Sequence, residues 1–403
     1  MWKQLAAAAA LAAGVTSFPV VAWAGPAPHA TSSANPNAHF LRSCAPTTSA
    51  ATAFCDAVLN TAAKPSKPGP GPTGANPAGY HPADLQSAYN VPSSTATPTV
   101  AIVDAYNDPY AASDLATYRA QFGLPACGSG CFTQVNQNGG TSLPRNNAGW
   151  SQEISLDLDM VSAICPTCHI LLVEASSASY ANLGTAVDTA AGWPGVVAIS
   201  NSYGGSDSSS DSSYDAYYDH PGKAVTVSSG DNAYGVEYPA SSPYVTAVGG
   251  TSLTKDASTA RGWTETAWSS AGSGCSAYEP QPSWQSSVSN ISSVCGGRAV
   301  ADVSADADPN TGVSVYDSYA YQGYKGWLVF GGTSVASPII ASMYALAGNT
   351  SGIDNGSYPY SHTSSLNDVT SGSNGSCGND LCNAVTGWDG PTGLGTPNGT
   401  GAF

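Results

Sequence analysis

The stretch that decides the fold is Thr99-Val100-Ala101-Ile102-Val103-Asp104-Ala105, an almost uninterrupted run of β-branched and small apolar residues. A run without polar alternation is typical of a strand buried on both faces of a parallel sheet. Similar runs recur along the chain, separated by segments with apolar residues at helical spacing. Strands alternating with helices predict an α/β fold, a parallel sheet with helices on both faces. The expected strands are 99–105, 169–174, 196–200, 224–228 and 244–248, and the expected helices are 114–122, 151–163 and 182–191.

The N-terminal region has the features of an export signal. Lys3 precedes an apolar run from Leu5 to Val21, and Ala22-Trp23-Ala24 has the small-x-small pattern of a cleavage site. We therefore expect residues 1–24 to be a signal peptide and the protein to be secreted. A membrane anchor is the competing interpretation, but the run is short for a bilayer and Pro19 interrupts it.

The region between this signal and the first predicted strand has little apolar periodicity. Residues 25–79 are interpreted as a poorly structured leader or short pro-segment, with a small ordered knot at the Cys44/Cys55 pair followed by a Pro/Gly linker at 63–72. Residues 80–403 are expected to form one large catalytic domain. The ten cysteines fall into close neighbours, and with an export signal they favour disulfides, although the sequence leaves the connectivity open. Pairing of neighbours is our hypothesis: 44/55, 127/131, 165/168, 275/295 and 377/382.

Charged residues make up 9% of the chain, and the formal net charge is −16. Nucleic acid is excluded as an expected partner, because phosphate binding needs clustered Lys and Arg. Few ion pairs are available to be lost in acid, so we expect the protein to tolerate low pH.

Ser334 is the candidate nucleophile. It follows Gly331-Gly332-Thr333, and apolar residues then recur at helical spacing, so the serine lies where a loop leads into a helix. Backbone N–H groups at a helix start stabilise an anion that develops beside the serine, although an N-cap serine would have the same position. Such a serine needs a base, and the histidine candidates are at 29, 39, 81, 169, 220 and 362.

The alternative base is a pair of carboxyls in one predicted helix. Glu153 and Asp157 are four residues apart and therefore share a helix face. Met160, Val161 and Ile164 indicate that this helix is buried. Burial and like charge favour sharing of one proton, so that one carboxyl can act as a base while the other holds it. A solvated acidic helix start is the competing interpretation.

A third candidate is Asp231, in the turn Ser228-Ser229-Gly230-Asp231 after a predicted strand. An Asx turn would explain this aspartate without any function. A protonated carboxyl at this place could instead donate a hydrogen bond to an oxyanion.

These three segments, in this order, resemble the sedolisin family of serine-carboxyl peptidases, which is similar to subtilisins in fold. The resemblance rests on the Glu-x-x-x-Asp helix, the Ser-Ser-Gly-Asp turn and Gly-Thr-Ser-x-x-x-Pro, and it covers about residues 80–403; the segment 298–309 adds to it. It implies that Ser334 attacks the scissile carbonyl, Glu153 takes and returns the proton, Asp157 holds Glu153, and Asp231 binds the oxyanion.

The resemblance also implies a substrate strand and a metal site. Ser200-Asn201-Ser202-Tyr203-Gly204 resembles the strand that pairs with the substrate backbone, so proteins or peptides are the expected substrates of a protein expected to be monomeric. Hard oxygen ligands near the C-terminus suit Ca²⁺. The implied ligands are the carboxylates of Asp368 and Asp389 and the carbonyls of Val369, Val385 and Gly387; family members often have Gly where Val385 stands.

Three other interpretations remain open from the sequence. Family members usually have a longer folded propeptide than residues 25–79, which leaves the activation route open and allows a catalytically silent binding protein on the same fold. Asp104 stands where subtilisins place their triad aspartate, so a Ser/His/Asp protease is the nearest rival mechanism. Cys165-Pro166-Thr167-Cys168-His169 matches a covalent-haem pattern, but a small disulfide is the simpler interpretation.

Overall fold

The computed structural model describes Met1 and residues 39–47, 49–64, 77–128, 130–349 and 352–403. The predicted signal peptide lies outside the described residues, as does most of the predicted Pro/Gly linker. No helix in the described ranges is long and apolar enough to cross a membrane.

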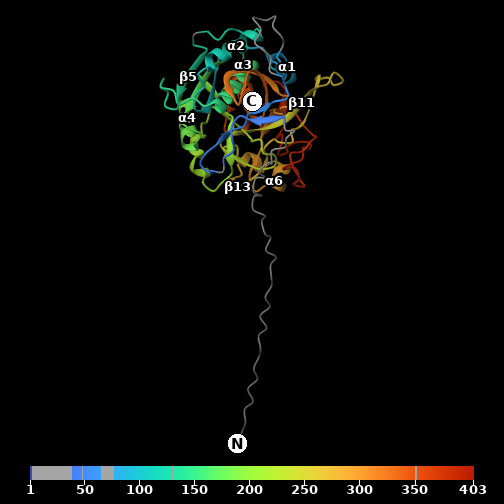
Figure 1. The fold of residues 1–403 in the computed structure, drawn as a ribbon. Helices are drawn as coiled ribbons and strands as arrows, with labels where there is room; N and C mark the ends of the chain where they lie inside the picture. Colours follow the sequence, from blue (N-terminus) through green and yellow to red (C-terminus); the bar gives the residue numbers. More distant parts are fainter. Residues whose placement is uncertain (2–38, 48, 65–76, 129, 350–351) are drawn as a thin grey trace. The chain divides into compact units, whose positions relative to one another are not determined.

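A mostly parallel sheet forms the centre of the fold (Figure 1). Its strand order is β12-β11-β9-β7-β4-β6-β5, with β15 also paired to β11. Only the β11–β12 pair is antiparallel among these described strands. The strands are β4 (Thr99–Ala105), β5 (Phe132–Asn136), β6 (His169–Ala175), β7 (Val196–Asn201), β9 (Ala224–Ser228), β11 (Thr246–Lys255), β12 (Trp263–Ala267) and β15 (Val303–Asp306).

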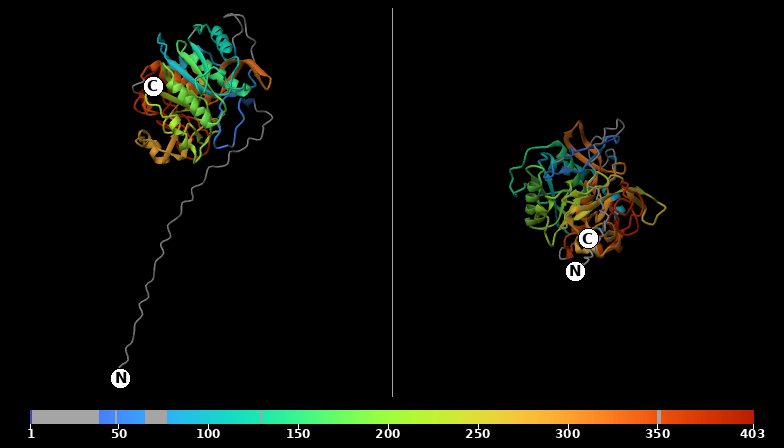
Figure 2. Two further views of the ribbon diagram at one scale, coloured as in Figure 1. Left: turned by 90° about the vertical axis from the view of Figure 1, so that its left-hand side faces the viewer. Right: turned by 90° about the horizontal axis from the view of Figure 1, so that it is seen from below.

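Helices cover both faces of this sheet, and the alternation of side chains along β4 shows how. Val100 and Ile102 join a core that includes α3 (Ala148–Ile164) and α7 (Thr333–Ala347). Ala101 and Val103 point to the opposite face and join the core of α4 (Tyr180–Gly192), the green helix in Figure 2. The fold class expected from the sequence is therefore confirmed. The remaining helices are α1 (Pro82–Ala88), α2 (Ala111–Gln121), α5 (Ser283–Ser286) and α6 (Ser289–Val294).

Residues 39–64, which the sequence placed in a poorly structured leader, form strands of the folded unit. Strand β1 (Phe40–Arg42) pairs with β3 (Val58–Asn60), and β3 pairs with β17 (Tyr324–Gly331), which pairs with β16 (Val313–Tyr321). Strand β2 (Phe54–Cys55) joins β8 (Tyr203–Ser206) and β10 (Glu237–Tyr238). The sequence predicted only a small ordered knot here, and it did not predict these strands, because they are two or three residues long and are held by distant partners rather than by local pattern.

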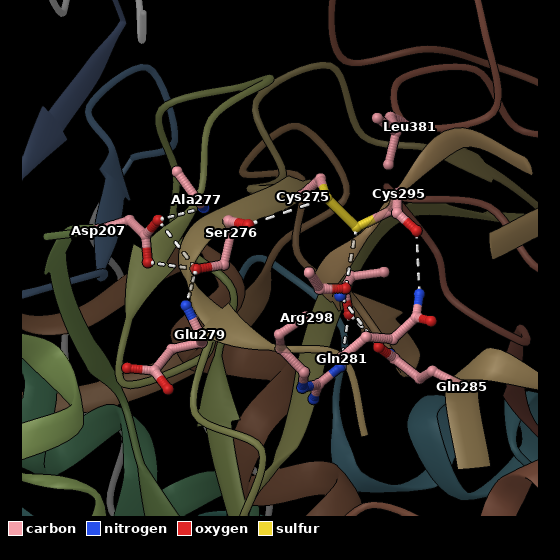
Figure 3. The surroundings of a disulfide bond; sticks show 12 residues. Asp207, Cys275, Ser276, Ala277, Glu279, Gln281, Gln285, Cys295, Arg298 and Leu381 are labelled. Carbon is pink, nitrogen blue, oxygen red and sulfur yellow. Dashed lines mark hydrogen bonds between the residues drawn. A yellow bond between two sulfur atoms is a disulfide. The ribbon is translucent and has the colours of Figure 1, made fainter. Parts of the chain in front are cut away.

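The five neighbour pairs of cysteines all form disulfides, as expected: 44–55, 127–131, 165–168, 275–295 and 377–382. The 165–168 bond occupies both sulfurs of the haem-like pattern, which removes the thiols that a covalent haem would need. Figure 3 shows the 275–295 bond, which links β13 (Gly274–Pro280) to the turn before β14 (Gly297–Val300). Gln281 Nε2 donates to the Cys295 carbonyl at 3.0 Å and adds to this link.

A buried ion pair joins β14 to the central sheet. Arg298 Nη2 and Asp302 Oδ2 are 2.5 Å apart, and both side chains are inaccessible to solvent. The same Asp302 oxygen accepts a hydrogen bond from Ala247 N in β11 at 2.7 Å. Loss of one partner would leave the other charge buried and unpaired, which is costly. The ion pair therefore holds β14 in its position beside β11. The last described strand pair is β18 (Leu366–Asn367) with β19 (Thr396–Pro397).

Candidate active site

Ser334 is the second residue of α7, as the Gly-Gly-Thr-Ser pattern predicted. The helix begins at Thr333 because Gly332, with φ of +98°, turns the chain sharply after β17. Ser334 is fully buried, and its hydroxyl donates to the Ser202 carbonyl at 3.4 Å. The serine therefore lies at the carboxyl edge of the sheet, beside the end of β7, where parallel α/β sheets place their sites.

Glu153 and Asp157 lie one turn apart on α3, which is buried along its length, and both side chains are fully buried. Burial raises the pKa of Glu153 well above its usual value, and the charges of Asp157 and Asp104 raise it further. The nearby Ser334 hydroxyl partly lowers the same pKa, and Glu153 Oε1 is buried without a hydrogen-bond partner. The structure thus brings together the serine and the carboxyl that the sequence paired.

Asp157 completes the link between the two helices and the end of β7. Its Oδ1 accepts a hydrogen bond from Ser202 Oγ at 2.8 Å, while Oδ2 has no hydrogen-bond partner. Burial raises the pKa of Asp157 well above its usual value. A proton shared with Glu153 relieves the repulsion between two buried carboxyls.

Asp104, at the end of β4, extends this chain of carboxyls. Both of its oxygens are buried without a hydrogen-bond partner. Burial raises the pKa of Asp104 well above its usual value, as do the nearby charges of Asp157 and Glu174. Sequence reasoning singled out Asp104 only as a possible partner for a histidine, because the pattern of a strand does not reveal which distant helix its residues will face.

No hydrogen bond joins Ser334 to any of the described histidines, which are at 39, 81, 169, 220 and 362. His81 Nε2 is paired with the Pro77 carbonyl, and His220 Nε2 is 3.3 Å from Asp188. His362 stacks on Tyr358, and His169 begins β6 at the end of the strand opposite to the carboxyl edge. Among the contacts of the described residues, no imidazole reaches the serine hydroxyl.

Asp231 follows β9 and faces the start of α7. Its Oδ1 accepts hydrogen bonds from Thr333 N at 2.8 Å and from Thr333 Oγ1 at 2.9 Å. Its Oδ2 is buried without a hydrogen-bond partner. Burial raises the pKa of Asp231 to about 6, although the Arg42 guanidinium and the Thr333 hydrogen bonds lower it in part. In acidic solution this carboxyl therefore carries a proton that it can donate.

The N-terminal strands contribute contacts that the sequence did not predict. Ala57 N donates to Glu153 Oε2 at 2.9 Å, and Arg42 Nη2 donates to the Asp231 carbonyl at 2.6 Å. Asp56 is fully buried, and its Oδ2 accepts a hydrogen bond from Ser228 Oγ at 2.7 Å. The only sequence signal for this arrangement is the Cys44/Cys55 pair, which indicates a local fold but does not indicate where it docks.

The predicted calcium ligands come together in the C-terminal loops. Gly387 N donates to Asp368 Oδ2 at 3.0 Å, and Val385 N donates to Asp389 Oδ2 at 3.1 Å, so both carboxylates face the loop 385–389. Burial raises the pKa of Asp389 to about 7, and the Asp368 charge contributes. Two carboxyl groups beside one loop are oxygen ligands of the kind that a hard cation prefers. Val369, the remaining predicted ligand, directly follows Asp368 and is buried.

A second acidic cluster lies apart from the predicted site. Asp108, Asp114 and Asp317 each place one oxygen within 4.8 Å of the others. Burial raises the pKa of Asp317 to about 8 and that of Asp108 to about 6. Sequence reasoning did not single out this cluster, because its members come from three separate segments.

Comparison with known proteins agrees with this arrangement. The family model of the subtilases matches residues 123–359. Kumamolisin of Bacillus sp. (strain MN-32) is 32% identical in an alignment 367 residues long, which covers 81% of this chain and 63% of kumamolisin. Sedolisin of Pseudomonas sp. (strain 101) is 38% identical in an alignment 207 residues long, which covers 43% of this chain and 33% of that protein. The chain thus spans less than two thirds of the length of either relative.

The fold of this chain is also similar to that of a solved structure. Pseudomonas sedolisin, described as a serine-carboxyl proteinase complexed with two molecules of pseudo-iodotyrostatin, superposes with a TM-score of 0.67 at 27% identity. The match covers 80% of this chain and 96% of that one. The fold and the family model define the class as the subtilases. Within that class the chain belongs to the sedolisin family.

Proposed function

We propose that this protein is a secreted serine-carboxyl endopeptidase that hydrolyses peptide bonds of proteins in acidic solution. The observation that carries the proposal is the proximity of the buried Ser334 hydroxyl to the buried Glu153 carboxyl, with Asp157 one turn away on the same helix as Glu153. Family membership supports the reaction class, and the solved relative is itself a serine-carboxyl proteinase.

In the proposed reaction, Ser334 Oγ attacks the carbonyl carbon of the substrate while Glu153 accepts the hydroxyl proton. Asp157 holds the second proton of the carboxyl pair and so stabilises Glu153 in each protonation state. Protonated Asp231 donates from Oδ2 to the oxyanion. Glu153 then returns the proton to the leaving amine, and water hydrolyses the acyl-enzyme by the same steps.

The acidic working range follows from Asp231. A carboxyl donates a hydrogen bond only while it is protonated, and the pKa of Asp231 is about 6. Oxyanion stabilisation should therefore fade as the pH rises through this value. Asp104 lies next to Asp157 and supplies a further carboxyl that can share the proton of the pair.

The remaining parts of the proposal concern substrate, metal and location. The Tyr203–Gly204 edge supports binding of extended proteins or peptides by strand addition. Asp368, Asp389 and the carbonyls of Val369, Val385 and Gly387 would hold Ca²⁺, which would stabilise the C-terminal loops. Five disulfides support secretion, with residues 1–24 as the signal and a monomeric peptidase domain over 80–403.

The test is hydrolysis of denatured casein in acidic buffer by the wild type, Ser334→Ala and Glu153→Gln. We expect both variants to lose activity by about 10³-fold or more, because each removes one member of a unit that acts together. Asp354→Asn, at an exposed loop, is the matched carboxyl control and should retain full activity. A wild type with no hydrolytic activity would instead support a silent binding protein.

A further inference from the structure

Three buried aspartates outside the proposed catalytic set lie close enough together to share one ion. Asp108 follows β4, Asp114 is in the first turn of α2, and Asp317 is in β16. Asp108 and Asp317 are fully buried, and Asp114 is 3% exposed. One oxygen of each lies within 4.8 Å of the other two. Ligands on opposite sides of a calcium ion are about 4.6–5.2 Å apart, so one ion can reach all three carboxyls.

The Asp317 carboxyl has one oxygen that no other group satisfies. Its Oδ1 accepts hydrogen bonds from Tyr319 N at 3.0 Å and from Ser151 Oγ at 3.4 Å, whereas its Oδ2 is buried without a hydrogen-bond partner. The carboxyl faces the other two aspartates, because the charges of Asp108 and Asp114 both raise its pKa. A buried oxygen without a partner is costly, and an ion bound between the three carboxyls would supply the missing contact.

The charge of these aspartates is not offset by a basic side chain. None of the ion pairs in the described part of the chain includes Asp108, Asp114 or Asp317. Carboxyls that are buried together need either protons or a cation to relieve their repulsion. Because the group contains only carboxyls, a hard cation fits it better than zinc or copper. Opposite ligands of Mg²⁺ are only about 4.0–4.2 Å apart, so a span of up to 4.8 Å favours Ca²⁺.

Helix α3 supplies two hydroxyls to the same place. Ser151 Oγ donates to Asp317 Oδ1 and Ser155 Oγ donates to Asp108 Oδ2, both at 3.4 Å. The two serines are buried and lie one turn apart. The proposed catalytic carboxyls of α3 are two positions further on, about 200° around the helix. The helix therefore presents its carboxyl pair on one face and two oxygen donors for a cation on another, where water can complete a shell of roughly 6–8 oxygens.

Hydrogen bonds hold the carboxyls in place just beneath the surface. Asp114 Oδ2 accepts from Ser318 N at 2.7 Å and Asp114 Oδ1 accepts from Ser318 Oγ at 2.9 Å, which ties α2 to β16. Asp108 Oδ1 accepts from Tyr110 N at 2.9 Å. Tyr110 is 46% exposed, and Ser113, next to Asp114, is also exposed. An ion therefore has a short path from solvent to the three aspartates.

We propose that Asp108, Asp114 and Asp317 bind a calcium ion, at a site separate from the one proposed in the C-terminal loops. The ion would link three segments that are distant in the sequence: the loop after β4, α2 and β16. This loop also meets the buried carboxyls of the central sheet, because Asp108 N donates to Glu174 Oε1 at 3.0 Å. The inference goes beyond the proposed function and does not depend on peptidase activity.

The ion should be held weakly. Both oxygens of Asp108 and both oxygens of Asp114 already accept hydrogen bonds, so calcium has to share them with these donors. We therefore expect a Kd of roughly 10⁻⁴–10⁻³ M, the range of extracellular calcium modules. A site of this strength is empty at trace calcium and does not respond to EGTA, so its occupancy is measured by adding calcium.

The test is calorimetric titration of Ca²⁺ alone, up to about 10 mM, into the full-length chain with Ser334→Ala, which prevents self-digestion. The protein is first stripped with EGTA and dialysed into buffer at pH 8, because carboxyl ligands must be deprotonated. We expect a tight and a weak binding phase. Asp389→Ala should lose only the tight phase, and Asp317→Asn should lose only the weak one. Asp306→Asn is the matched control, a fully buried aspartate whose Oδ2 also lacks a partner, and it should retain both phases.

Thermal unfolding verifies that the variants fold and gives a second measurement. Asparagine at position 317 keeps an acceptor for Tyr319 N and has no charge to bury, so Asp317→Asn should be as stable as its parent without calcium. Calcium at about 10 mM is roughly 10–100 times the expected Kd and should raise the melting temperature of Asp389→Ala by roughly 2–4 °C. The double variant Asp317→Asn/Asp389→Ala should gain nothing.

The other outcomes overturn the site. A titration without a weak phase would mean that the three aspartates hold only protons. A weak phase that persists in Asp317→Asn would place the ion elsewhere. Loss of both phases in Asp389→Ala would leave the C-terminal loops as the one calcium site that the titration detects. None of these results affects the peptidase proposal, which hydrolysis of casein tests separately.

Discussion

Glu174→Gln should stabilise the protein at neutral pH and leave its stability in acid nearly unchanged. Glu174 is the penultimate residue of β6 and is fully buried; its Oε1 accepts hydrogen bonds from Asp108 N at 3.0 Å and Gln134 Nε2 at 2.9 Å. Burial raises the pKa of Glu174 from 4.5 to about 8. Glutamine retains the acceptor and has no proton to lose.

The size of the effect follows from linkage. A carboxyl whose folded pKa is raised holds its proton in the native state and loses it on unfolding, so its contribution is fully present below pH 4.5 and is lost as the pH rises towards 8. The interval from pH 4.5 to pH 7 is about 2.5 pH units. At about 1.36 kcal/mol per unit, the wild type therefore loses roughly 3 kcal/mol of its free energy of unfolding over this interval. For a chain of this size that is a shift in melting temperature of roughly 4 °C.

The assay is calorimetric unfolding at pH 4 and pH 7 in a Ser334→Ala background, which prevents self-digestion. Glu174→Gln should melt higher than its parent at pH 7 and within about 1 °C of it at pH 4. Asp354→Asn, on an exposed loop, serves as the control and should change neither value. A variant that is destabilised equally at both pH values would refute the reasoning, because the raised pKa would then have no energetic consequence.

Three further substitutions or treatments test separate parts of the site. Asp231→Ala should lower kcat by about 10²–10³-fold through loss of an oxyanion donor, whereas Asp231→Asn should retain more activity and extend it above pH 6; equal losses in both variants would contradict the donor role. Gly332→Ala should abolish hydrolysis and lower the melting temperature, because the new Cβ would collide with the Asp56 carbonyl and the backbone at this position has φ of +98°. Normal kinetics in this variant would contradict the position of Gly332 against the Asp56 carbonyl. Chelation of Ca²⁺ by EGTA should destabilise the wild type by about 2–4 kcal/mol, whereas EGTA should hardly affect the stability of Asp389→Ala. Melting temperatures of both proteins with and without EGTA measure this difference. If EGTA lowers both melting temperatures equally, the proposed C-terminal calcium site is wrong.

The central sheet could be predicted from the sequence because its signals are local. The run 99–105 is buried on both sides, and β4 occupies those residues without change. The helix expected at 151–163 is α3 at Ala148–Ile164, which begins earlier because the Asn147 side chain accepts hydrogen bonds from Gly149 N and Trp150 N. A cap of this kind is easily missed when the apolar pattern alone defines the boundary.

The contacts of the N-terminal segment could not be predicted, because they join residues far apart in the sequence. Strand β2 consists of Phe54 and Cys55, too short for any periodicity, and it pairs with β8 about 150 residues later. The position of Asp104 beside Asp157 depends likewise on how α3 packs on β4. Residue types and spacing indicated Ser334 and its carboxyl pair, whereas the N-terminal contacts to Glu153 and Asp231 emerged only from tertiary structure.

The central claim is that a carboxyl, not an imidazole, activates the Ser334 hydroxyl. The most direct test is the pH dependence of kcat/KM for the enzyme on a peptide without ionisable side chains. We predict a maximum in acid and a fall as the pH rises through about 6, where Asp231 loses its proton. A rate that instead climbs through this region to a plateau at neutral or alkaline pH would indicate a histidine base and contradict the account.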